Sequence, residues 1–327
     1  MSVTSESDVS NVPEENAEWH DLIQRNPEDA AAASERALHF LRIAEIHEPI
    51  LNHLNLRDVC AFGQIHRDLR GAPGAHFDSH FNTLLRRFFA DAKGFRNILR
   101  RLQAVISGST VLSFISRDPW ESRDLDLYCP LGTAHLMCDY LSEVEGYGQP
   151  RVVRRSAYSA QQGIGKILRM KKLVDQVVAE GGEATQRQIQ IDIIESITTL
   201  AVEPITNFHS TAVMNFLYAD GVVVLYPDLT FRRISVKSNR PNIKFPPYPK
   251  YEQRGYLIVE TGYDFLCRTA CPVLYRATHD GASMMLRFRD NGTFVPGLAY
   301  WRLNPNDGEM DDCLNVSCPK RTFIPIA

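Results

Sequence analysis

Residues 104–130, AVISGSTVLSFISRDPWESRDLDLYCP, decide which fold this chain can adopt. An apolar run ends in a Gly-Ser pair, and Asp124 and Asp126 follow further on with one leucine between them. Because side chains alternate across a strand, the two aspartates share one face of a strand predicted to end at Pro130, while its leucines share the other. Neighbouring carboxylates repel each other, and burying them is costly unless a positive charge compensates. The segment therefore points to a cation, such as a metal ion, beside the pair.

A third carboxylate lies in RQIQIDIIES, residues 187–196, which alternates polar and apolar side chains as a half-buried strand does. Gln188, Gln190 and Asp192 share its polar face. If this strand pairs with the one that carries Asp124, three carboxylates converge. Mg²⁺ binds one or two carboxylates together with substrate phosphates, and two ions about 3.5–4 Å apart promote phosphoryl transfer. The pattern predicts a divalent-metal site.

The Gly-Ser pair, Gly108 and Ser109, adds a place for a phosphate. The apolar run before it is predicted to be a strand, and STVLSFIS is predicted to be a helix that begins at Ser109. Free N–H groups and the positive end of the helix dipole favour an anion there, and a glycine lets the backbone approach a phosphate closely. A metal cluster joined to a phosphate site is what a nucleoside triphosphate (NTP) needs.

The ordered set ISGS, DLDL and IDI resembles the nucleotidyltransferase fold of DNA polymerase beta, poly(A) polymerases and their relatives. The resemblance covers roughly residues 95–230, and the gap of fourteen residues between Ser109 and Asp124 is at the long end for that family. It implies an α/β (α+β) fold, a mixed sheet flanked by helices. An ordinary α/β domain with aspartates in turns or salt bridges is the alternative.

The resemblance also implies roles for the motif residues. Mg²⁺ or Mn²⁺ would bind Asp124 and Asp126. Asp192 would help to bind metal or deprotonate the acceptor hydroxyl, and Ser109, beside Gly108, would contact the terminal phosphates of the NTP. The implied reaction is transfer of a nucleotidyl group to an acceptor hydroxyl; a nucleic acid stays open as the acceptor.

Two further groups carry weaker signals. Lys166, Arg169, Lys171 and Lys172 either line a phosphate or acceptor channel or form the solvated face of a basic helix. Asn215, in STAVMNFL, either contacts the base or ribose of the nucleotide or lies in a segment whose Met and Phe belong to the core.

The stretch IHEPILNHLNLRDVCAFGQIHRDLR, residues 46–70, resembles an F-box, the helical module that docks the adaptor subunit of cullin-type ubiquitin ligases. Pro49 follows Glu48 rather than preceding it, and the tryptophan usual near the end of the module is missing. F-box-like helices before an SGS…DLDLY block resemble an arrangement in predicted proteins of mushroom-forming fungi. The alternative is a helical cap packed on the catalytic domain.

The chain is therefore expected to have four parts. Residues 1–35 are expected to form a disordered acidic tail with nine acidic side chains against one arginine, which leaves about +5 on the remainder of a chain whose net charge is −3. Residues 36–100 form the F-box-like region, 101–240 the nucleotidyltransferase-like domain and 241–327 a C-terminal extension. The rival to an enzyme is a non-catalytic substrate receptor of a ubiquitin ligase that uses the α/β domain for binding.

Cysteine usage and hydropathy bear on location. The seven cysteines are scattered and follow no secretory signal, which favours reduced thiols in a cytoplasmic or nuclear protein. No apolar run is long enough for a membrane span, so no membrane partner is expected. Cys267, Cys271, Cys313 and Cys318 have the spacing of a loose zinc site, and four unrelated thiols are the alternative.

Overall fold

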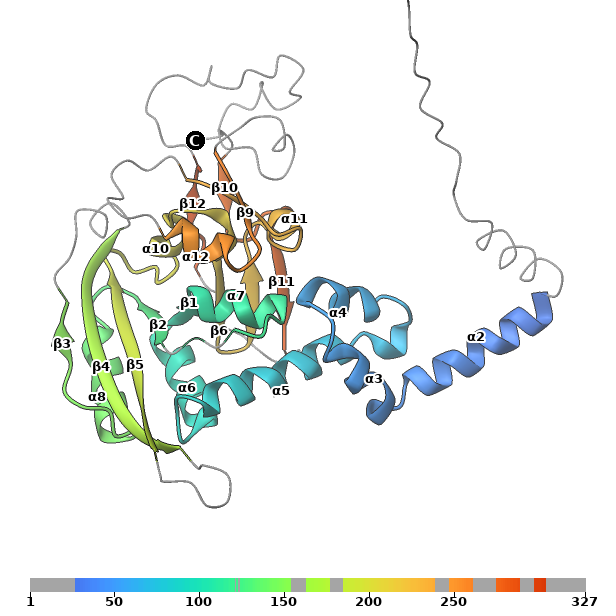
Figure 1. Cartoon of the computed structure of the whole chain (residues 1–327), viewed down its shortest axis with the longest axis horizontal. Coiled ribbons are helices and arrows are strands. Elements are labelled where there is room, and N and C mark those ends of the chain that lie inside the picture. The colour runs from blue at the N-terminus through green and yellow to red at the C-terminus, as the bar shows by residue number, and fades with distance from the viewer. Residues whose placement is uncertain are drawn as a thin grey trace, which may run out of the picture.

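The computed structural model describes residues 27–120, 122, 124–153, 163–176, 185–238, 247–260, 275–288 and 297–303. In this part of the chain the protein is an α/β structure built on an eight-stranded, mostly antiparallel sheet (Figure 1). The strand order is β11-β7-β6-β1-β2-β5-β4-β3. The four cysteines of the loose zinc motif, and residues 1–26 of the expected tail, lie outside the described residues.

The eight strands of the large sheet are β1 (Val105–Ser107), β2 (Asp124–Cys129), β3 (Arg151–Val152), β4 (Ile164–Gln176), β5 (Thr185–Ser196), β6 (Asn215–Tyr218), β7 (Gly221–Val224) and β11 (Met284–Arg287). Two short pairs accompany it: β8 (Ile234–Val236) with β9 (Leu257–Val259), and β10 (Arg276–Ala277) with β12 (Tyr300–Trp301). In the described part of the large sheet, β2 and β5 are the parallel neighbours, and this pairing places the polar faces of the two aspartate strands side by side.

The α-helices are α2 (Pro27–Leu41), α3 (Ala44–Leu51), α4 (Leu56–Phe62), α5 (Ala72–Arg86), α6 (Ala92–Leu102), α7 (Ser109–Ser116), α8 (Ala134–Glu143), α10 (Glu203–Thr206), α11 (Pro227–Thr230) and α12 (Tyr248–Glu252). Short 3₁₀ turns lie at Arg67–Leu69 and Thr211–Val213. In Figure 1, α5 and α6 run along the lower side of the sheet, and α2 projects away from the rest of the molecule. No helix in the described ranges is long and apolar enough to cross a membrane.

The segment that decides the fold forms the predicted strand, helix and strand. β1 ends at Ser107, α7 begins at Ser109, and β2 ends at Cys129 before Pro130, which has no N–H to continue a ladder. The expected α/β class is confirmed.

Several local predictions need correction. Helix α2 begins at Pro27, so residues 27–35, expected in the tail, are helical. The F-box-like region also contains α5 and α6, which are separate helices: α5 ends at Arg86 and α6 begins at Ala92. The physical reason is a cap: the carboxylate of Asp91 accepts a hydrogen bond of 2.9 Å from the N–H of Gly94, where a Cβ would collide with that carboxylate.

The basic segment over residues 164–176 is strand β4, not the basic helix considered above. Its charges alternate across the sheet. Arg169 lies opposite Asp192 and Lys171 opposite Gln190, on one face. Lys166 and Lys172 lie opposite Glu195 and Ile189, on the other face. The apolar residues on that second face, Leu168 and Met170, are buried, and their burial stabilises the packing of the strand.

A single buried core runs from Leu51 to Leu303 and continues across residue 100. Arg96 of α6 reinforces it, because its guanidinium donates to Asp78 on α5 at 2.7 Å and to the carbonyl of Ala219 at 2.8 Å. Arg100 pairs with Asp220 through two hydrogen bonds, one of them 2.9 Å long. Helices α5 and α6 are therefore fixed to the β6–β7 turn by both apolar and charged contacts.

Candidate functional site

Three aspartates meet on one face of the sheet. In the parallel pairing of β2 with β5, Asp126 lies beside Asp192 and Asp124 beside Gln190. Residues at the same level of adjacent strands have side chains on the same face, so the carboxylates of Asp126 and Asp192 are direct neighbours. Asp124 is exposed and the other two are half-buried. The convergence expected from the two alternating segments is therefore present.

Gly108 brings the backbone up against this cluster. It lies between β1 and α7 with φ of 78°, a left-handed conformation that side chains rarely adopt. A Cβ built on it would collide with Oδ2 of Asp126. Glycine is thus required both by the turn and by the carboxylate, and the start of α7 is held next to the aspartate pair.

Two serines link the helix start to Asp124. The hydroxyl of Ser122 lies 2.8 Å from Asp124 Oδ1 and 3.0 Å from the Asp124 carbonyl, to either of which it can donate. The hydroxyl of Ser109, the first residue of α7, lies 3.5 Å from that of Ser122. Thr110 donates to the Asp124 carbonyl at 3.0 Å. The predicted phosphate residue and the predicted metal ligand are therefore parts of one hydrogen-bonded group.

Lys250 is a site residue that the sequence analysis missed. It lies on α12, and its Nζ is 3.5 Å from the hydroxyl of Ser109. Burial and the nearby Arg254 lower the pKa of Lys250, while Asp124 and Asp126 act in the opposite sense. The sequence around it, PPYPKY, has the composition of a link, and no local motif connects it to Ser109 at a separation of 141 residues.

The electrostatics of the cluster centre on Asp126. Burial, followed by the charges of Asp124 and Asp192, raises the pKa of Asp126 to about 7. Lys250 and Arg169 offset part of this effect. Near neutral pH the negative charge on Asp126 is therefore unfavourable in the absence of a cation. A cation bound beside it would stabilise the charged form.

Asp192 already has a cationic partner. Arg169 on the neighbouring strand donates from Nε to Oδ1 at 2.8 Å and from Nη2 to Oδ2 at 2.7 Å. The amide of Gln190 adds a hydrogen bond of 3.3 Å to Oδ1. This two-pronged pair is the strongest arrangement between an arginine and a carboxylate, and it occupies both oxygens of Asp192.

Three residues proposed from the sequence are not brought to the cluster. Lys166 lies on the face of the sheet opposite Asp192, and its Nζ is 3.8 Å from Glu195. Asn215 is fully buried at the start of β6, where its amide donates to the carbonyl of Ala212 at 2.6 Å. Lys172, also on the opposite face, donates to the carbonyl of Glu145 at 2.6 Å. Of the four basic residues on β4, Arg169 and Lys171 share the face of the aspartates.

The donor set fits one divalent cation better than two. Asp124 and Asp126 offer carboxylate oxygens next to the start of α7, and Mg²⁺ needs one or two such groups when phosphates complete its shell. A closed cage is not preformed: among the described residues, no group of three or more His, Cys, Asp or Glu side chains is arranged to hold a metal. Asp192, paired with Arg169, does not fit the role of a third ligand in this arrangement.

Comparison of the chain with known proteins finds no matching family model, no matching curated protein and no matching solved structure.

Proposed function

We propose that this protein is a nucleotidyltransferase-fold enzyme that binds an NTP with one Mg²⁺ or Mn²⁺ ion and transfers a nucleotidyl group to an acceptor hydroxyl. The observation that carries the proposal is the meeting of Asp124 and Asp126 with the start of α7 and with Lys250. An acidic pair beside a helix start and a lysine combines sites for a cation and for phosphates. The resemblance of the ordered motifs supports the same reading.

Each residue has a role that follows from its position. Asp124 and Asp126 would hold the ion, which when bound neutralises charge on the phosphates. The backbone N–H groups at the start of α7, the Ser109 hydroxyl and Lys250 would bind the phosphate oxygens. These groups are held by the fold before substrate arrives, so catalysis would come mainly from positioning and charge complementarity.

The role of Asp192 differs from the one implied by the resemblance. Both oxygens of Asp192 accept hydrogen bonds from the guanidinium of Arg169, so the carboxylate is not free to contact an acceptor hydroxyl. We infer that Asp192 and Arg169 act together as a fixed neutral unit beside the ion, and that Asp192 deprotonates the acceptor only if Arg169 moves away.

Replacing Lys250 with methionine tests the phosphate site. The side chain keeps its length and loses its charge, so affinity for ATP·Mn²⁺ is expected to fall about 10–100-fold while affinity for Mn²⁺ alone changes little. Isothermal titration of the full chain with each of the four NTPs measures the first quantity, and the paramagnetic resonance of Mn²⁺ measures the second. Transfer of label from an α-phosphate-labelled NTP tests the reaction itself.

Lys93→Met is the matched control, because Lys93 is exposed on α6 away from the aspartates. Equal losses in the two variants would show that general charge, rather than the position of Lys250, determines affinity. Failure of the unaltered protein to bind any NTP with Mn²⁺ would remove the proposed activity.

Replacing Arg169 with glutamine tests the fixed pair. Without the guanidinium, Asp192 adds its full charge to the cluster, and Mn²⁺ is expected to bind about tenfold more tightly, which is about 1.4 kcal/mol. The control is Lys171→Gln, which removes the same charge two residues away on the same face of β4. Tighter Mn²⁺ binding in both variants would indicate a long-range effect of net charge, and unchanged binding in R169Q would show that the pair does not limit the ion.

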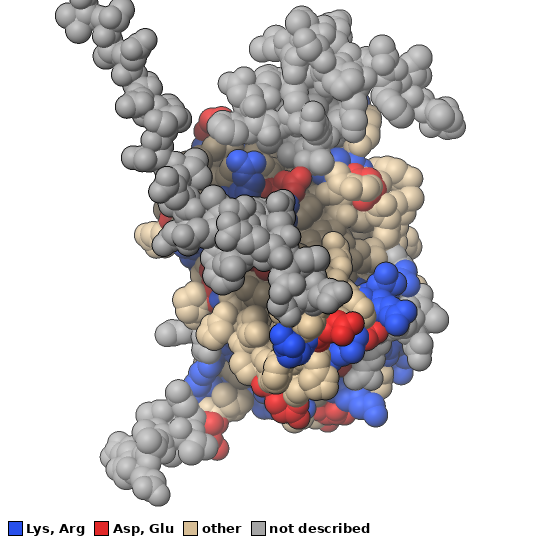
Figure 2. Space-filling view, turned by 90° about the vertical axis from the view of Figure 1, so that its right-hand side faces the viewer, with Lys and Arg blue, Asp and Glu red and all other residues tan. Residues whose placement is uncertain are grey.

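A second candidate function rests on the helical front end, whose apolar residues divide into two groups. One group packs in the core: Leu51, Leu56, Val59, Phe62 and Leu69. The other is exposed: Phe40, Ile46, Ile50 and Ile65. Figure 2 views the molecule from this side, where uncharged surface lies among scattered acidic and basic side chains. The exposed apolar residues favour docking of the adaptor subunit of a cullin-type ubiquitin ligase.

Binding to a purified adaptor subunit tests this candidate. The double variant Ile46→Asp, Ile50→Asp is expected to lose binding, and Leu136→Asp, at an exposed leucine of α8, is expected to retain it. No binding by the unaltered chain, or equal binding by all three proteins, would contradict adaptor docking and leave the nucleotide site unaffected.

A further inference from the structure

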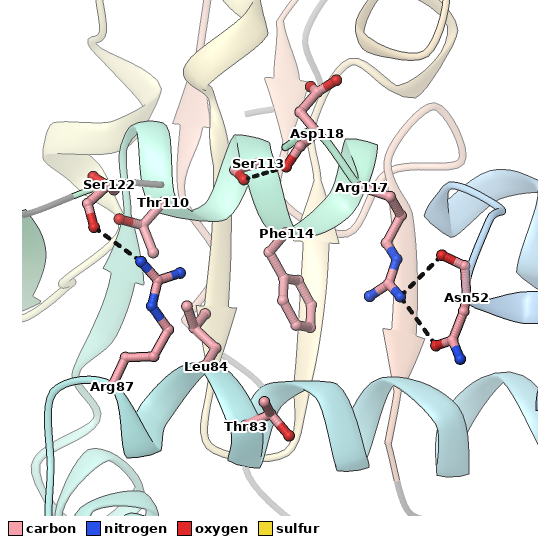
Figure 3. A pocket seen from close by; sticks show the side chains of 10 residues that line it. All are labelled: Asn52, Thr83, Leu84, Arg87, Thr110, Ser113, Phe114, Arg117, Asp118 and Ser122. Atoms are coloured by element: carbon pink, nitrogen blue, oxygen red, sulfur yellow. Dashed lines mark hydrogen bonds between the residues drawn. The ribbon is translucent and has the colours of Figure 1, made fainter. Parts of the chain in front are cut away.

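A pocket beside the aspartate cluster lies between α5 and α7 and has a volume of about 280 Å³ (Figure 3). Two of the residues that line it, Thr110 and Ser122, bond to Asp124. Its size is near the lower end of the range for small-molecule sites, roughly 300–1,000 Å³. Leu84 from α5 and Phe114 from α7 project into it between the helices, and Arg87 and Arg117 reach in from opposite ends. The pocket thus has apolar side chains at its centre and an arginine at each end.

The hydrogen-bond partners of the Arg117 guanidinium are uncharged groups. Its Nη2 lies 3.2 Å from the carbonyl of Asn52 and 3.4 Å from Oδ1 of the same residue. The ring nitrogen of His80 lies 3.2 Å away, and burial and the charge of Arg117 lower the pKa of His80 to about 4, so that histidine is neutral. Burial also lowers the pKa of Arg117. In the described ranges, no carboxylate forms an ion pair with this half-buried guanidinium.

The carboxylates nearby are engaged elsewhere. Asp118 also lines the pocket, but its two oxygens accept from Arg233, one of them at 3.0 Å, and Figure 3 shows its carboxylate directed away from α5. Glu48 acts on Arg117 by its charge, but its own carboxylate is 2.7 Å from Nδ1 of His76. Among the described residues, Arg117 therefore has no carboxylate in direct contact, and an anion that enters this end of the pocket can pair with it.

The backbone at Arg117 strengthens this reading. Arg117 follows the last residue of α7 with φ of 58°, a left-handed conformation at which glycine is usual and other residues cost about 1–2 kcal/mol. The structure tolerates that cost at a position whose side chain is aimed into the pocket.

We propose that this pocket binds a small organic anion, a carboxylate or phosphate on a compact apolar body, with Arg117 as the contact for the anion and Phe114 and Leu84 as the contacts for the body. At the other end, Arg87 donates to the carbonyl of Ser122 at 3.3 Å, which fixes the wall of the pocket on that side. The contacts proposed for the anion and its body do not include Asp124, Asp126 or Lys250, so this binding can be tested separately from the nucleotidyl transfer proposed above.

Isothermal titration of the full chain with phenyl phosphate, benzoate and phenol at constant ionic strength tests the proposal. At least one of the two anions is expected to bind saturably, and phenol, which has the same ring and no charge, at least tenfold more weakly. The anion that binds identifies the headgroup. Absence of binding by both anions, or equal binding by phenol, would overturn the proposal.

Three variants locate the binding. Arg117→Gln is expected to weaken anion binding at least tenfold, and Arg86→Gln, an exposed arginine of α5, is expected to change nothing. Thr83→Tyr fills the pocket from an exposed position on α5 without altering charge, and is expected to abolish binding in a protein that keeps its melting temperature. Binding that survives both R117Q and T83Y would overturn the proposal.

A further variant separates this pocket from the nucleotide site. Lys250→Met is expected to leave binding of the anion unchanged, because Lys250 does not line the pocket. Loss of phenyl phosphate binding in K250M together with retention in R117Q would assign the anion to the start of α7 and overturn the proposal, while the proposed nucleotide site would stand.

Discussion

Replacing Asp126 with asparagine is expected to lower transfer of a nucleotidyl group at least a hundredfold and, in the same protein, to raise the free energy of unfolding of the metal-free form by about 2 kcal/mol at pH 8. Both effects come from one charge. In the absence of a cation, the carboxylate of Asp126 is half-buried between two others, and burial and those charges raise its pKa to about 7. When a cation is bound, the same carboxylate would be one of its ligands.

The dependence on pH has a definite sign. The pKa of Asp126 rises from 3.8 in the unfolded chain to about 7 in the fold, so between these values the folded state holds more protons. The free energy of unfolding of the metal-free protein therefore falls as pH rises from about 4 to 7. The full shift corresponds to about 4 kcal/mol, and partial access of water reduces the expected loss to about 2 kcal/mol.

Chemical denaturation in EDTA at pH 5 and pH 8 measures this loss. In D126N the free energy of unfolding should no longer contain the loss between pH 5 and pH 8 that comes from residue 126. The control Asp139→Asn, at an exposed residue of α8, should keep it. A D126N protein that is less stable than the unaltered chain at pH 8 would show that the carboxylate is stabilised, rather than strained, by its neighbours.

Replacing Arg96 with methionine is expected to lower the free energy of unfolding by about 3–5 kcal/mol. Arg96 is buried, and its guanidinium bonds to Asp78, to Asn82 at 3.0 Å and to the carbonyl of Ala219. Methionine fills similar space but removes the positive charge from the buried carboxylate of Asp78. The same change also removes the hydrogen bond from α6 to the carbonyl of Ala219, and leaves Arg100 with Asp220 as the charged contact between α6 and the β6–β7 turn.

Urea denaturation followed by circular dichroism measures this loss, and Arg101→Met, at an exposed position of the same helix, is expected to change the free energy by less than about 0.5 kcal/mol. A loss below about 1 kcal/mol in R96M would mean that the bonds of Arg96 contribute little, and that the apolar contacts and the Arg100–Asp220 pair attach these helices to the sheet. The conservative variant Arg96→Lys keeps the charge and should lie between the two.

The local signals of the sequence predicted the strands and the helix that carry the candidate site. The strand, the helix that begins at Ser109 and the strand that ends before Pro130 depend on alternation and on backbone preferences within a few residues. The same alternation placed Asp192 on the polar face of β5, and the parallel register then brought it to Asp126. Side-chain faces are fixed by period, so the convergence of carboxylates followed once the strands paired.

What could not be predicted depends on contacts between distant segments. Lys250 reaches Ser109 from a proline-rich segment that has no recognisable period. Arg169 was considered as a phosphate contact because its segment is basic, but only the register of β4 against β5 sets it opposite Asp192. The pocket that contains Arg117 brings Asn52, which follows α3, together with α5 and α7, and its polar residues form no recognisable motif along the chain.

The hydroxyl of Ser122 has one proton and three oxygens within reach. Two belong to Asp124, and the third is the hydroxyl of Ser109. A hydroxyl donates to one acceptor at a time in a well-formed bond. A cation bound to Oδ1 of Asp124 would leave the Ser122 hydroxyl free to donate to Ser109 instead. A phosphate hydrogen-bonded to Ser109 would change the partner of Ser122 in turn, and so change how strongly Asp124 binds the cation. Cation and phosphate would then be linked reciprocally, each altering the affinity for the other by the same factor.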